Sequence, residues 1–332
     1  MRKFLENVLG KAYVKIKASP YFTSLYYSVA NSSYFSNFFE HEKMLIDRAR
    51  MDTYHKAITD EVKEGDTVID LGTGTGILSF FAASKSPKKI YAIDHGKIIE
   101  SAKIVSKHNN IKNIEFVNVN SKNFDLNSNE KADIIIHEQI GALLFDEHMV
   151  VNILDLRDRV LKKGGKILPG KFEVYIEPVK LKNEFRVPYI WEMDVYGIKY
   201  DCFNSTKENL DGNYKCIFIK PNEVDYFLCE PERVLYFDME TMKADSLPKQ
   251  IKYTKKVTRA GNMDGFCFYF NAIFDNGTVL TTDPLISTTH CWNVPILRTV
   301  AKHYKAGDTV TLDLEWEDPS DINTYKWNIE TA

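Results

Sequence analysis

The chain has 332 residues, of which 44% are hydrophobic and 13% aromatic. This composition excludes a mainly disordered protein, because it supplies enough apolar side chains for the cores of two globular units. The formal net charge is −3, from 43 basic and 46 acidic residues. Such a balance does not favour a nucleic-acid partner, since proteins that bind phosphates concentrate positive charge.

The five cysteines form no CxxC pair, and an odd number fits poorly with a disulfide-stapled secreted domain. We therefore expect reduced thiols, a cytoplasmic location and no metal site. Lysines interrupt every apolar run of residues 1–33 before it reaches the length of a signal peptide or a membrane span. Residues 1–38 are predicted to be a soluble helical lead-in. A peripheral membrane helix or partner-binding helix is the alternative.

Hydrophobic periodicity predicts an α/β domain over residues 39–168. Apolar side chains recur at helical spacing from Phe39 to Val62, which predicts a helix that leads into the first strand. The predicted strands are Thr67–Leu71, Lys89–Ile93, Ile114–Val119 and Asp133–Ile136, and helix-length stretches, Gly76–Ser84 and His95–Asn109, separate the first three. Strands that alternate with helices are typical of a parallel, doubly wound sheet.

The pattern changes near residue 168. The run Phe172-Glu173-Val174-Tyr175-Ile176 alternates apolar and polar side chains, which is typical of antiparallel strands. We therefore predict a β-rich domain over residues 169–332. One segment, about 183–208, interrupts it and is too rich in aromatic residues for a solvated loop, so it is predicted to be an arm that packs on another surface.

A glycine-rich turn follows the first predicted strand. Asp70 near the strand end precedes Gly72, Gly74 and Gly76. Without side chains, such a turn lets a ligand approach backbone N–H groups at a helix start. Dinucleotide-binding turns have the spacing GxGxxG, whereas this run is GxGxG after an acidic residue. The pattern favours S-adenosyl-L-methionine as the cofactor.

Polar side chains end the next two strands. Asp94 ends the second strand, where a carboxylate can accept hydrogen bonds from both hydroxyls of a ribose. A helix N-cap is the alternative for Asp94. Asn120 and Ser121 end the third strand, where the edge of an adenine would lie, although turns also contain these residues.

Two glutamates, Glu138 and Glu147, leave one mostly apolar loop after the fourth predicted strand. If both point into one pocket, their repulsion requires a cation between them. A planar guanidinium can donate paired hydrogen bonds to each carboxylate, so the pair predicts a guanidine substrate. The alternative is that Glu147, beside Asp146 and His148, lies on a solvated helix start.

Three motifs in this order resemble the protein arginine methyltransferases. They are His41-Glu42-Lys43-Met44-Leu45 with Asp47 and Arg50, then Glu138, Gly141, Glu147 and Met149, and finally Thr289-His290-Cys291-Trp292. The resemblance implies a seven-stranded class I methyltransferase domain of Rossmann-like fold, followed by a β-barrel-like domain with a helical dimerisation arm. It also implies a head-to-tail homodimer and an arginine-containing protein or peptide as substrate.

The resemblance also implies roles for single residues. In the catalytic group, Glu138 and Glu147 would clamp the guanidinium, while His290 with Asp47 would help its proton leave. In the cofactor-binding group, Arg50 would pair with the methionine carboxylate, and Met44 and Met149 would flank the methyl-transfer channel. Tyr34 and Glu138 complete the predicted contacts to the cofactor.

The chain departs from the family pattern at Cys291, which looks like an insertion or a replacement in a Thr-His-Trp loop, and at three further positions. Phe38 replaces the second tyrosine of a Tyr-Phe-x-x-Tyr motif, and Gln139 and Ala142 stand where large aromatics are usual. The altered pocket wall leaves open a second substrate class, free arginine or another small guanidine. A catalytically silent dimeric scaffold is the alternative from another class. Neither a basic groove nor a nucleobase clamp supports a nucleic-acid methyltransferase.

Overall fold

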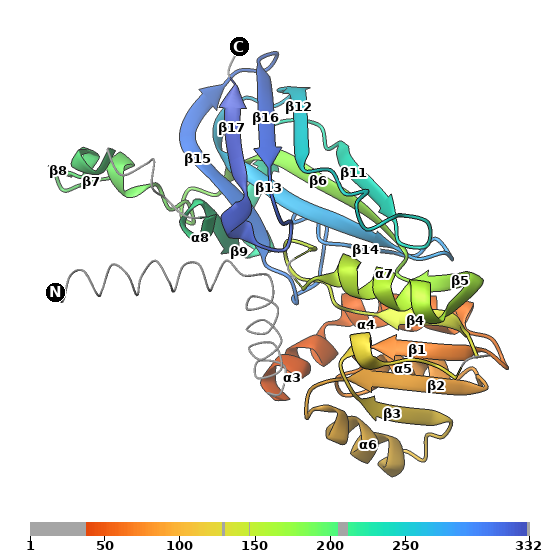
Figure 1. The fold of residues 1–332 in the computed structure, drawn as a ribbon. Coiled ribbons are helices and arrows are strands. Elements are labelled where there is room, and N and C mark those ends of the chain that lie inside the picture. Colours follow the sequence, from red (N-terminus) through yellow and green to blue (C-terminus); the bar gives the residue numbers. More distant parts are fainter. Residues whose placement is uncertain (1–37, 128–129, 146, 205–211, 331–332) are drawn as a thin grey trace, which may run out of the picture.

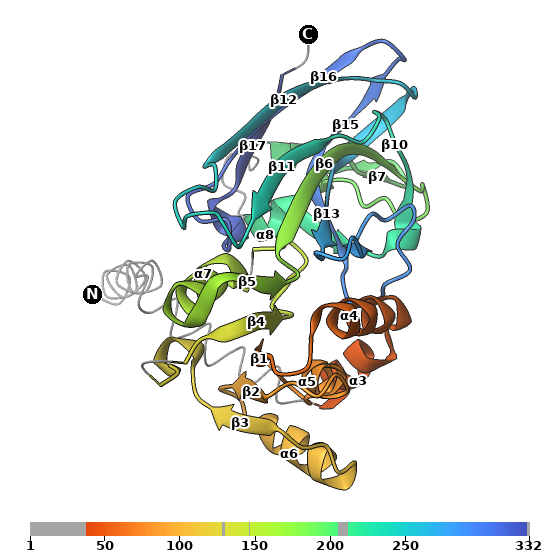
Figure 2. The same ribbon diagram turned by 90° about the vertical axis from the view of Figure 1, so that its right-hand side faces the viewer.

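The structure is a computed structural model that describes residues 38–127, 130–145, 147–204 and 212–330. The predicted N-terminal lead-in, apart from Phe38, lies outside these residues, and so does Tyr34. The described chain forms an α/β unit and an antiparallel β unit, one stacked on the other (Figures 1 and 2). Among these residues no helix is both long and apolar enough to cross a membrane.

The α/β unit is built on a parallel sheet with the strand order β3-β2-β1-β4-β5. The strands are β1 (Thr67–Leu71), β2 (Lys89–Asp94), β3 (Ile114–Asn118), β4 (Ala132–His137) and β5 (Leu161–Leu168). The predicted Rossmann-like core is therefore confirmed, and within the described residues its sheet has five strands where seven were expected. After β5 the chain enters β6 (Lys171–Leu181), which pairs with strands of the second unit and leaves the parallel sheet.

The helices of this unit are α3 (Phe38–Ile46), α4 (Arg48–Glu61), α5 (Ile77–Ala83), α6 (Ile99–His108) and α7 (Met149–Val160). The prediction of one helix from Phe39 to Val62 is wrong, because Asp47 divides it. Asp47 has extended backbone angles, and its Oδ1 accepts a hydrogen bond from the N–H of Arg50 at 3.1 Å. An aspartate in this position ends one helix and caps the next.

The second unit consists of antiparallel sheets. The larger has seven strands, with the path β10-β6-β13-β15-β9, β11 paired to β6 and β14 paired to β13; the smaller has the order β12-β16-β17. The strands are β9 (Cys216–Ile219), β10 (Val224–Phe227), β11 (Arg233–Asp238), β12 (Gln250–Lys256), β13 (Gly261–Ile273), β14 (Val279–Thr281), β15 (Val294–Tyr304), β16 (Thr309–Glu315) and β17 (Lys326–Glu330). The predicted β-rich domain is confirmed.

One hydrophobic core runs through both units. Tyr54 of α4 is fully buried, and its ring meets the edge of Phe274 from the β unit at 5.2 Å between centroids. Phe145, which follows β4, lies 5.8 Å from Phe237 of β11. These contacts pack the two units against each other across their junction.

The arm projects from the β unit (Figure 1). Its described part, residues 183–204, contains the 3-10 turn η2 (Ile190–Glu192) and a small hairpin of β7 (Asp194–Val195) and β8 (Ile198–Lys199). The expected helical arm is therefore a hairpin in this part. Tyr196 and Gly197 form its turn with φ angles of 52° and 85°, because two-residue hairpin turns favour positive φ.

The base of the arm is fixed by charge. Arg186 donates from Nε to Asp264 Oδ1 at 2.7 Å and from Nη2 to Glu192 Oε1 at 3.0 Å. The guanidinium of Arg298 on β15 lies 4.0 Å from the centre of the Tyr189 ring. These contacts hold the base of the arm against the sheet, whereas the side chain of Tyr196 at the tip is fully exposed.

Candidate active site

The glycine turn joins β1 to α5. The N–H groups of Gly72 and Thr73 both donate to the carbonyl of Ile93, at 2.9 and 3.0 Å. Gly74 and Gly76 have φ angles of 54° and 91°, and Gly72 has 77°, a region that favours glycine. A Cβ on Gly76 would lie 2.6 Å from the Phe80 ring. The turn therefore needs glycine both for its conformation and for space.

Asp70 lies beneath this turn. It is fully buried, and its Oδ2 accepts hydrogen bonds from Thr73 Oγ1 at 2.7 Å, Ser79 Oγ at 2.6 Å and Ser79 N at 3.0 Å. Burial raises the pKa of Asp70 to about 6. Asp70 does not line the cavity described below, so it is not placed for the predicted direct contact with the cofactor. It has a structural role instead. The carboxylate holds the turn and the first turn of α5 in place.

Asp94 is the last residue of β2 and points toward the same turn. Its Oδ2 accepts from Gly74 N at 2.9 Å and its Oδ1 from Gly96 N at 2.7 Å. The N-cap of α6 is Ile98, so the alternative reading of Asp94 as that cap is wrong. Each carboxylate oxygen has a second lone pair, and Asp94 can therefore still accept hydrogen bonds from a ligand.

Two neighbouring cavities open at the carboxyl edge of the parallel sheet, as expected for this fold. The larger has a volume of about 350 Å³. Of the predicted residues, it brings together Met44, Arg50, Gly72, Gly74, Asp94, Glu138, Glu147 and His290. The smaller has a volume of about 210 Å³ and contains Asn120 and Ser121. Gly72, Asp94, His95, Gln139 and Glu147 line both cavities.

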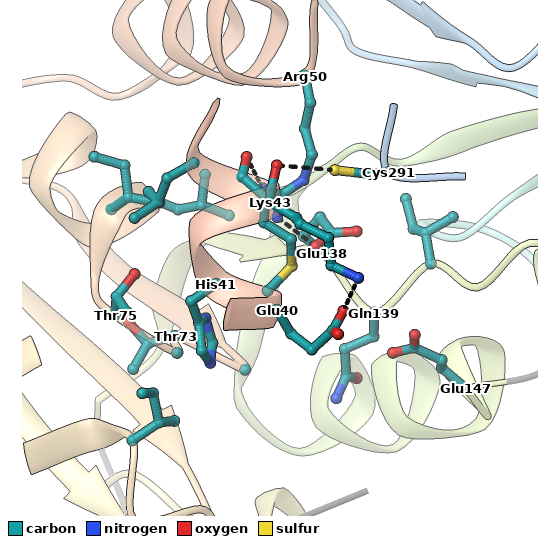
Figure 3. Close-up of a pocket in the computed structure, with 18 of the residues that line it drawn as sticks. Glu40, His41, Lys43, Arg50, Thr73, Thr75, Glu138, Gln139, Glu147 and Cys291 are labelled. Atoms are coloured by element: carbon teal, nitrogen blue, oxygen red, sulfur yellow. Dashed lines mark hydrogen bonds and ion pairs between the residues drawn. The ribbon is translucent and has the colours of Figure 1, made fainter. Parts of the chain in front are cut away.

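Arg50 of α4 reaches Glu138 at the end of β4 (Figure 3). Its Nη2 donates to Glu138 Oε2, and its Nη1 donates to the carbonyl of Met44 at 3.1 Å. Burial raises the pKa of Glu138 although the Arg50 charge opposes this shift. Arg50 Nε is sealed from solvent without a hydrogen-bond partner among the described residues. The guanidinium therefore retains a donor that an anionic ligand can use.

Asp47 connects the two units. Its Oδ2 accepts from Thr289 Oγ1, from His290 N at 2.6 Å and from Cys291 N at 3.0 Å. Burial raises the pKa of Asp47, but these hydrogen bonds and the one from Arg50 N outweigh it, and the pKa is lowered. The predicted pairing of Asp47 with His290 thus uses the backbone N–H of His290. The exposed side chain of His290 lines the larger cavity instead.

The loop that carries the glutamates is held from the β unit. Trp292 donates from Nε1 to the carbonyl of Ile140 at 2.6 Å, and the Phe145 ring lies 6.3 Å from that of Trp316. Glu147 directly precedes His148, the N-cap of α7, and borders both cavities. Met149 is fully buried in the core and lines neither cavity, so its predicted place beside the methyl-transfer channel is wrong. As the first residue of α7 it faces the core.

Several lining residues were not predicted as site residues. His41 of α3 packs on the glycine turn, where a Cβ on Gly74 would lie 2.8 Å from its ring. Its helical spacing from Met44 could have indicated this, since residues three apart share a face. Gln139 and Cys291 each adjoin a predicted residue in the chain, and their lining position depends on tertiary contacts.

Comparison with known families supports both units. Residues 62–220 match the family described as methyltransferase domain, and residues 171–326 match the arginine methyltransferase oligomerization subdomain. A probable protein arginine N-methyltransferase 6 of Arabidopsis thaliana is 33% identical over 243 residues, which span 70% of this chain and 54% of that protein. Protein arginine N-methyltransferase 6 of Danio rerio is 30% identical over 267 residues, 77% of this chain and 75% of that one.

Solved structures share the fold. The Trypanosoma brucei PRMT1 enzyme-prozyme heterotetrameric complex with AdoHcy matches with a TM-score of 0.76 at 21% identity, over 90% of this chain and 95% of that one. Arabidopsis thaliana protein arginine methyltransferase 10 matches with a TM-score of 0.72 at 23% identity, over 90% of this chain and 99% of that one. The fold, an α/β unit followed by an antiparallel β unit, is therefore shared with these two chains.

Proposed function

Because the chain belongs to the protein arginine methyltransferase family, we propose that it transfers the methyl group of S-adenosylmethionine to an arginine side chain in a protein or peptide. One observation carries this proposal. Glu138 and Glu147 border the same cavity as the glycine turn and Asp94. Two carboxylates beside a cofactor turn fit a planar cation that has to be held against a methyl donor.

The residues present fit S-adenosylmethionine as the cofactor. The sealed Nε of Arg50 is suited to the methionine carboxylate, and the glycine turn leaves room that a Cβ on Gly74 would fill. Asp94 is placed to accept from the ribose hydroxyls, and Asn120 and Ser121 border the smaller cavity, where the adenine would lie. When bound, the cofactor supplies an electrophilic methyl group on a sulfonium.

The role of the chain is mainly to orient the acceptor. Glu138 is held by Arg50 through Oε2 and by a hydrogen bond from the Ile140 backbone, and its carboxylate still has lone pairs that can accept from the substrate guanidinium. Glu147 accepts from the same group on the other side. The two carboxylates localise the positive charge away from the attacking nitrogen and place that nitrogen in line with the methyl group. The exposed His290 borders the cavity and is placed to take the released proton.

We also propose a head-to-tail homodimer that forms through the arm. Apolar side chains of the arm remain exposed in the single chain, among them Val187, Tyr196 and Ile198. Such a patch is typical of an interface, and the match to an oligomerization subdomain supports this reading. The described cysteines are all free thiols, which supports the cytoplasmic location proposed here.

A small guanidine such as free arginine is the second candidate substrate. Gln139 and Ala142 line the larger cavity where the family usually carries large aromatics, so the wall beside the acceptor differs. A protein-directed site gains binding energy from residues that flank the target arginine, and a metabolite-directed site does not.

The test is mass spectrometry after incubation with labelled S-adenosylmethionine, an arginine-rich peptide mixture and, separately, free arginine. Label on peptide arginine supports the proposal. Label on free arginine alone transfers the same chemistry to a small guanidine. If S-adenosylmethionine binds in a calorimetric titration but no acceptor is labelled, the scaffold alternative gains support.

A further inference from the structure

Gln139 occupies the junction of the two cavities. It follows Glu138 at the end of β4 and lies over the glycine turn, with Cγ at 3.6 Å and Nε2 at 3.7 Å from the position of a Cβ on Gly72. It lines both cavities. Figure 3 shows that its side chain runs away from the Glu138 carboxylate. The amide therefore points away from the Glu138 carboxylate, on a residue that borders both cavities.

The Oε1 atom of Gln139 is sealed from solvent and has no hydrogen-bond partner among the described residues. An amide oxygen accepts up to two hydrogen bonds, and a buried acceptor without a partner destabilises the chain that carries it. A phenylalanine side chain at this position would have no such atom. The glutamine is thus unfavourable unless a ligand supplies a donor.

We propose that Gln139 accepts a hydrogen bond from the adenosyl part of the cofactor and is a specificity residue for the methyl donor. This inference rests on the cofactor placement of the proposed function. A ligand that extends from Arg50 to Asn120 and Ser121 passes the junction where Gln139 and Asp94 lie. The donors that it presents there, the two ribose hydroxyls and the adenine amino group, are divided between Asp94 and Gln139, and one of them meets Oε1.

Replacement of Gln139 should change the stability of the free chain and the affinity for the cofactor in opposite directions. Replacement of Gln139 by methionine keeps the length of the side chain and removes the unpartnered oxygen. The chain without ligand should then be as stable as the wild type or more stable, since an unsatisfied buried acceptor is gone. The affinity for the cofactor should fall, because the ligand donor loses its partner. A purely structural residue would not change the two quantities in opposite directions.

The experiment is a calorimetric titration of the full chain with S-adenosylhomocysteine. We expect Gln139→Met to weaken binding by roughly 5- to 30-fold, the usual range for one buried hydrogen bond. Its midpoint of thermal unfolding without ligand should equal or exceed that of the wild type. The matched control is Gln250→Met, the same change at an exposed amide of β12 whose Nε2 donates to Asp313. The control should bind like the wild type.

A second measurement identifies the donor and does not depend on one variant. Wild type and Gln139→Met are titrated with analogues of S-adenosylhomocysteine that lack the 2′-hydroxyl, the 3′-hydroxyl or both hydrogens of the adenine amino group. One of the three analogues should bind the wild type more weakly than the parent ligand does. The same analogue and the parent ligand should bind Gln139→Met with equal affinity. Equal affinity of Gln139→Met and wild type for the parent ligand overturns the proposal. The proposal is also overturned if the wild type binds all three analogues as tightly as it binds the parent ligand.

The outcomes separate this inference from the function on which it rests. If the wild type binds S-adenosylhomocysteine and Asp94→Ala weakens that binding, the cofactor placement holds whatever Gln139 does. If Gln139→Met changes only the KM for the peptide and leaves the ligand affinity unchanged, Gln139 contacts the acceptor and the inference is overturned. If the wild type binds no S-adenosylhomocysteine, the proposed function fails together with it.

Discussion

The guanidinium of Arg50 and the carboxylate of Glu138 form a buried ion pair between α4 and the end of β4. An arginine of the chain itself therefore fixes one carboxylate of the proposed clamp. Its Nη1 is held in turn by the carbonyl of Met44, at the end of α3. The break in the helix at Asp47 and the orientation of Glu138 are thus parts of one arrangement.

Glu138→Gln should lower kcat by roughly 10²- to 10³-fold, because it removes a charge that acts on the reacting guanidinium in a dry site. The affinity for S-adenosylhomocysteine should change much less, since Arg50 keeps its donors for the methionine carboxylate. Steady-state kinetics with a peptide substrate and calorimetry on the same protein separate the two quantities. Glu147→Gln is the companion variant. Turnover close to that of the wild type in Glu138→Gln would refute the clamp.

Asp47→Ala should lower the free energy of unfolding by about 3–5 kcal/mol, because a helix cap and three further donors lose a buried acceptor. The donors that lose their partner belong to Thr289, His290 and Cys291, so contact between the two units is weakened. Urea unfolding measures the change. The control is Asp60→Ala, an exposed aspartate paired with Lys56 and Asn276, which should leave the free energy of unfolding nearly unchanged. Equal effects of the two variants would contradict the role given to Asp47.

The sheet of the α/β unit could be predicted from the sequence because its signals are local. Each strand is a short apolar run, and the glycine turn follows Asp70 directly. The break at Asp47 could not be predicted in this way. It depends on residues 289–291, which are far away in the chain and supply most of the donors to that carboxylate.

Side-chain direction was the other source of error. Asp70 and Met149 belong to motifs that point to a site, yet both are fully buried behind the cavity walls. Motif spacing places a residue on a segment but does not determine which face of that segment meets the ligand. Gln139 shows the converse, since only the packed structure places its amide between two cavities.

The pH dependence of stability should include a contribution from His137. Burial lowers the pKa of this histidine to about 4, against a hydrogen bond between Nε2 and the carbonyl of Pro169. Since Nδ1 is sealed without a partner among the described residues, a second proton would bury a charge. Between pH 6.5 and 4, His137 is protonated in the unfolded chain and neutral in the folded chain. His137 therefore reduces stability as the pH falls, by about 2 kcal/mol from pH 7 to pH 5.

The contribution of Asp70 has the opposite sign. Its pKa is raised to about 6 in the folded chain, so the stability that it contributes is present at low pH and is lost as the pH rises through 6. The difference between wild type and His137→Leu isolates the histidine, since Asp70 is common to both. Urea unfolding at pH 7 and pH 5 should show that the variant loses about 2 kcal/mol less than the wild type. Equal losses would contradict a neutral buried His137.

Tyr196→Asp should weaken the proposed homodimer, because a charge at the tip of the arm would be buried against the second copy. Tyr196 is fully exposed in the single chain, and no contact within the described chain explains an aromatic side chain there. Loss of one such anchor raises the dissociation constant of a dimer by roughly 30-fold or more. Sedimentation velocity over a range of protein concentrations measures this change.

The matched control is Tyr236→Asp, the same change at an exposed tyrosine of β11. Tyr236 stacks on Arg233 of its own strand and lies outside the arm, so this variant should sediment like the wild type. Because the arm is fixed at its base by Asp264 and Arg298, Tyr196→Asp should leave the thermal unfolding of the single chain unchanged. A dimer that persists in Tyr196→Asp at low micromolar concentration would mean that the two copies meet through another surface.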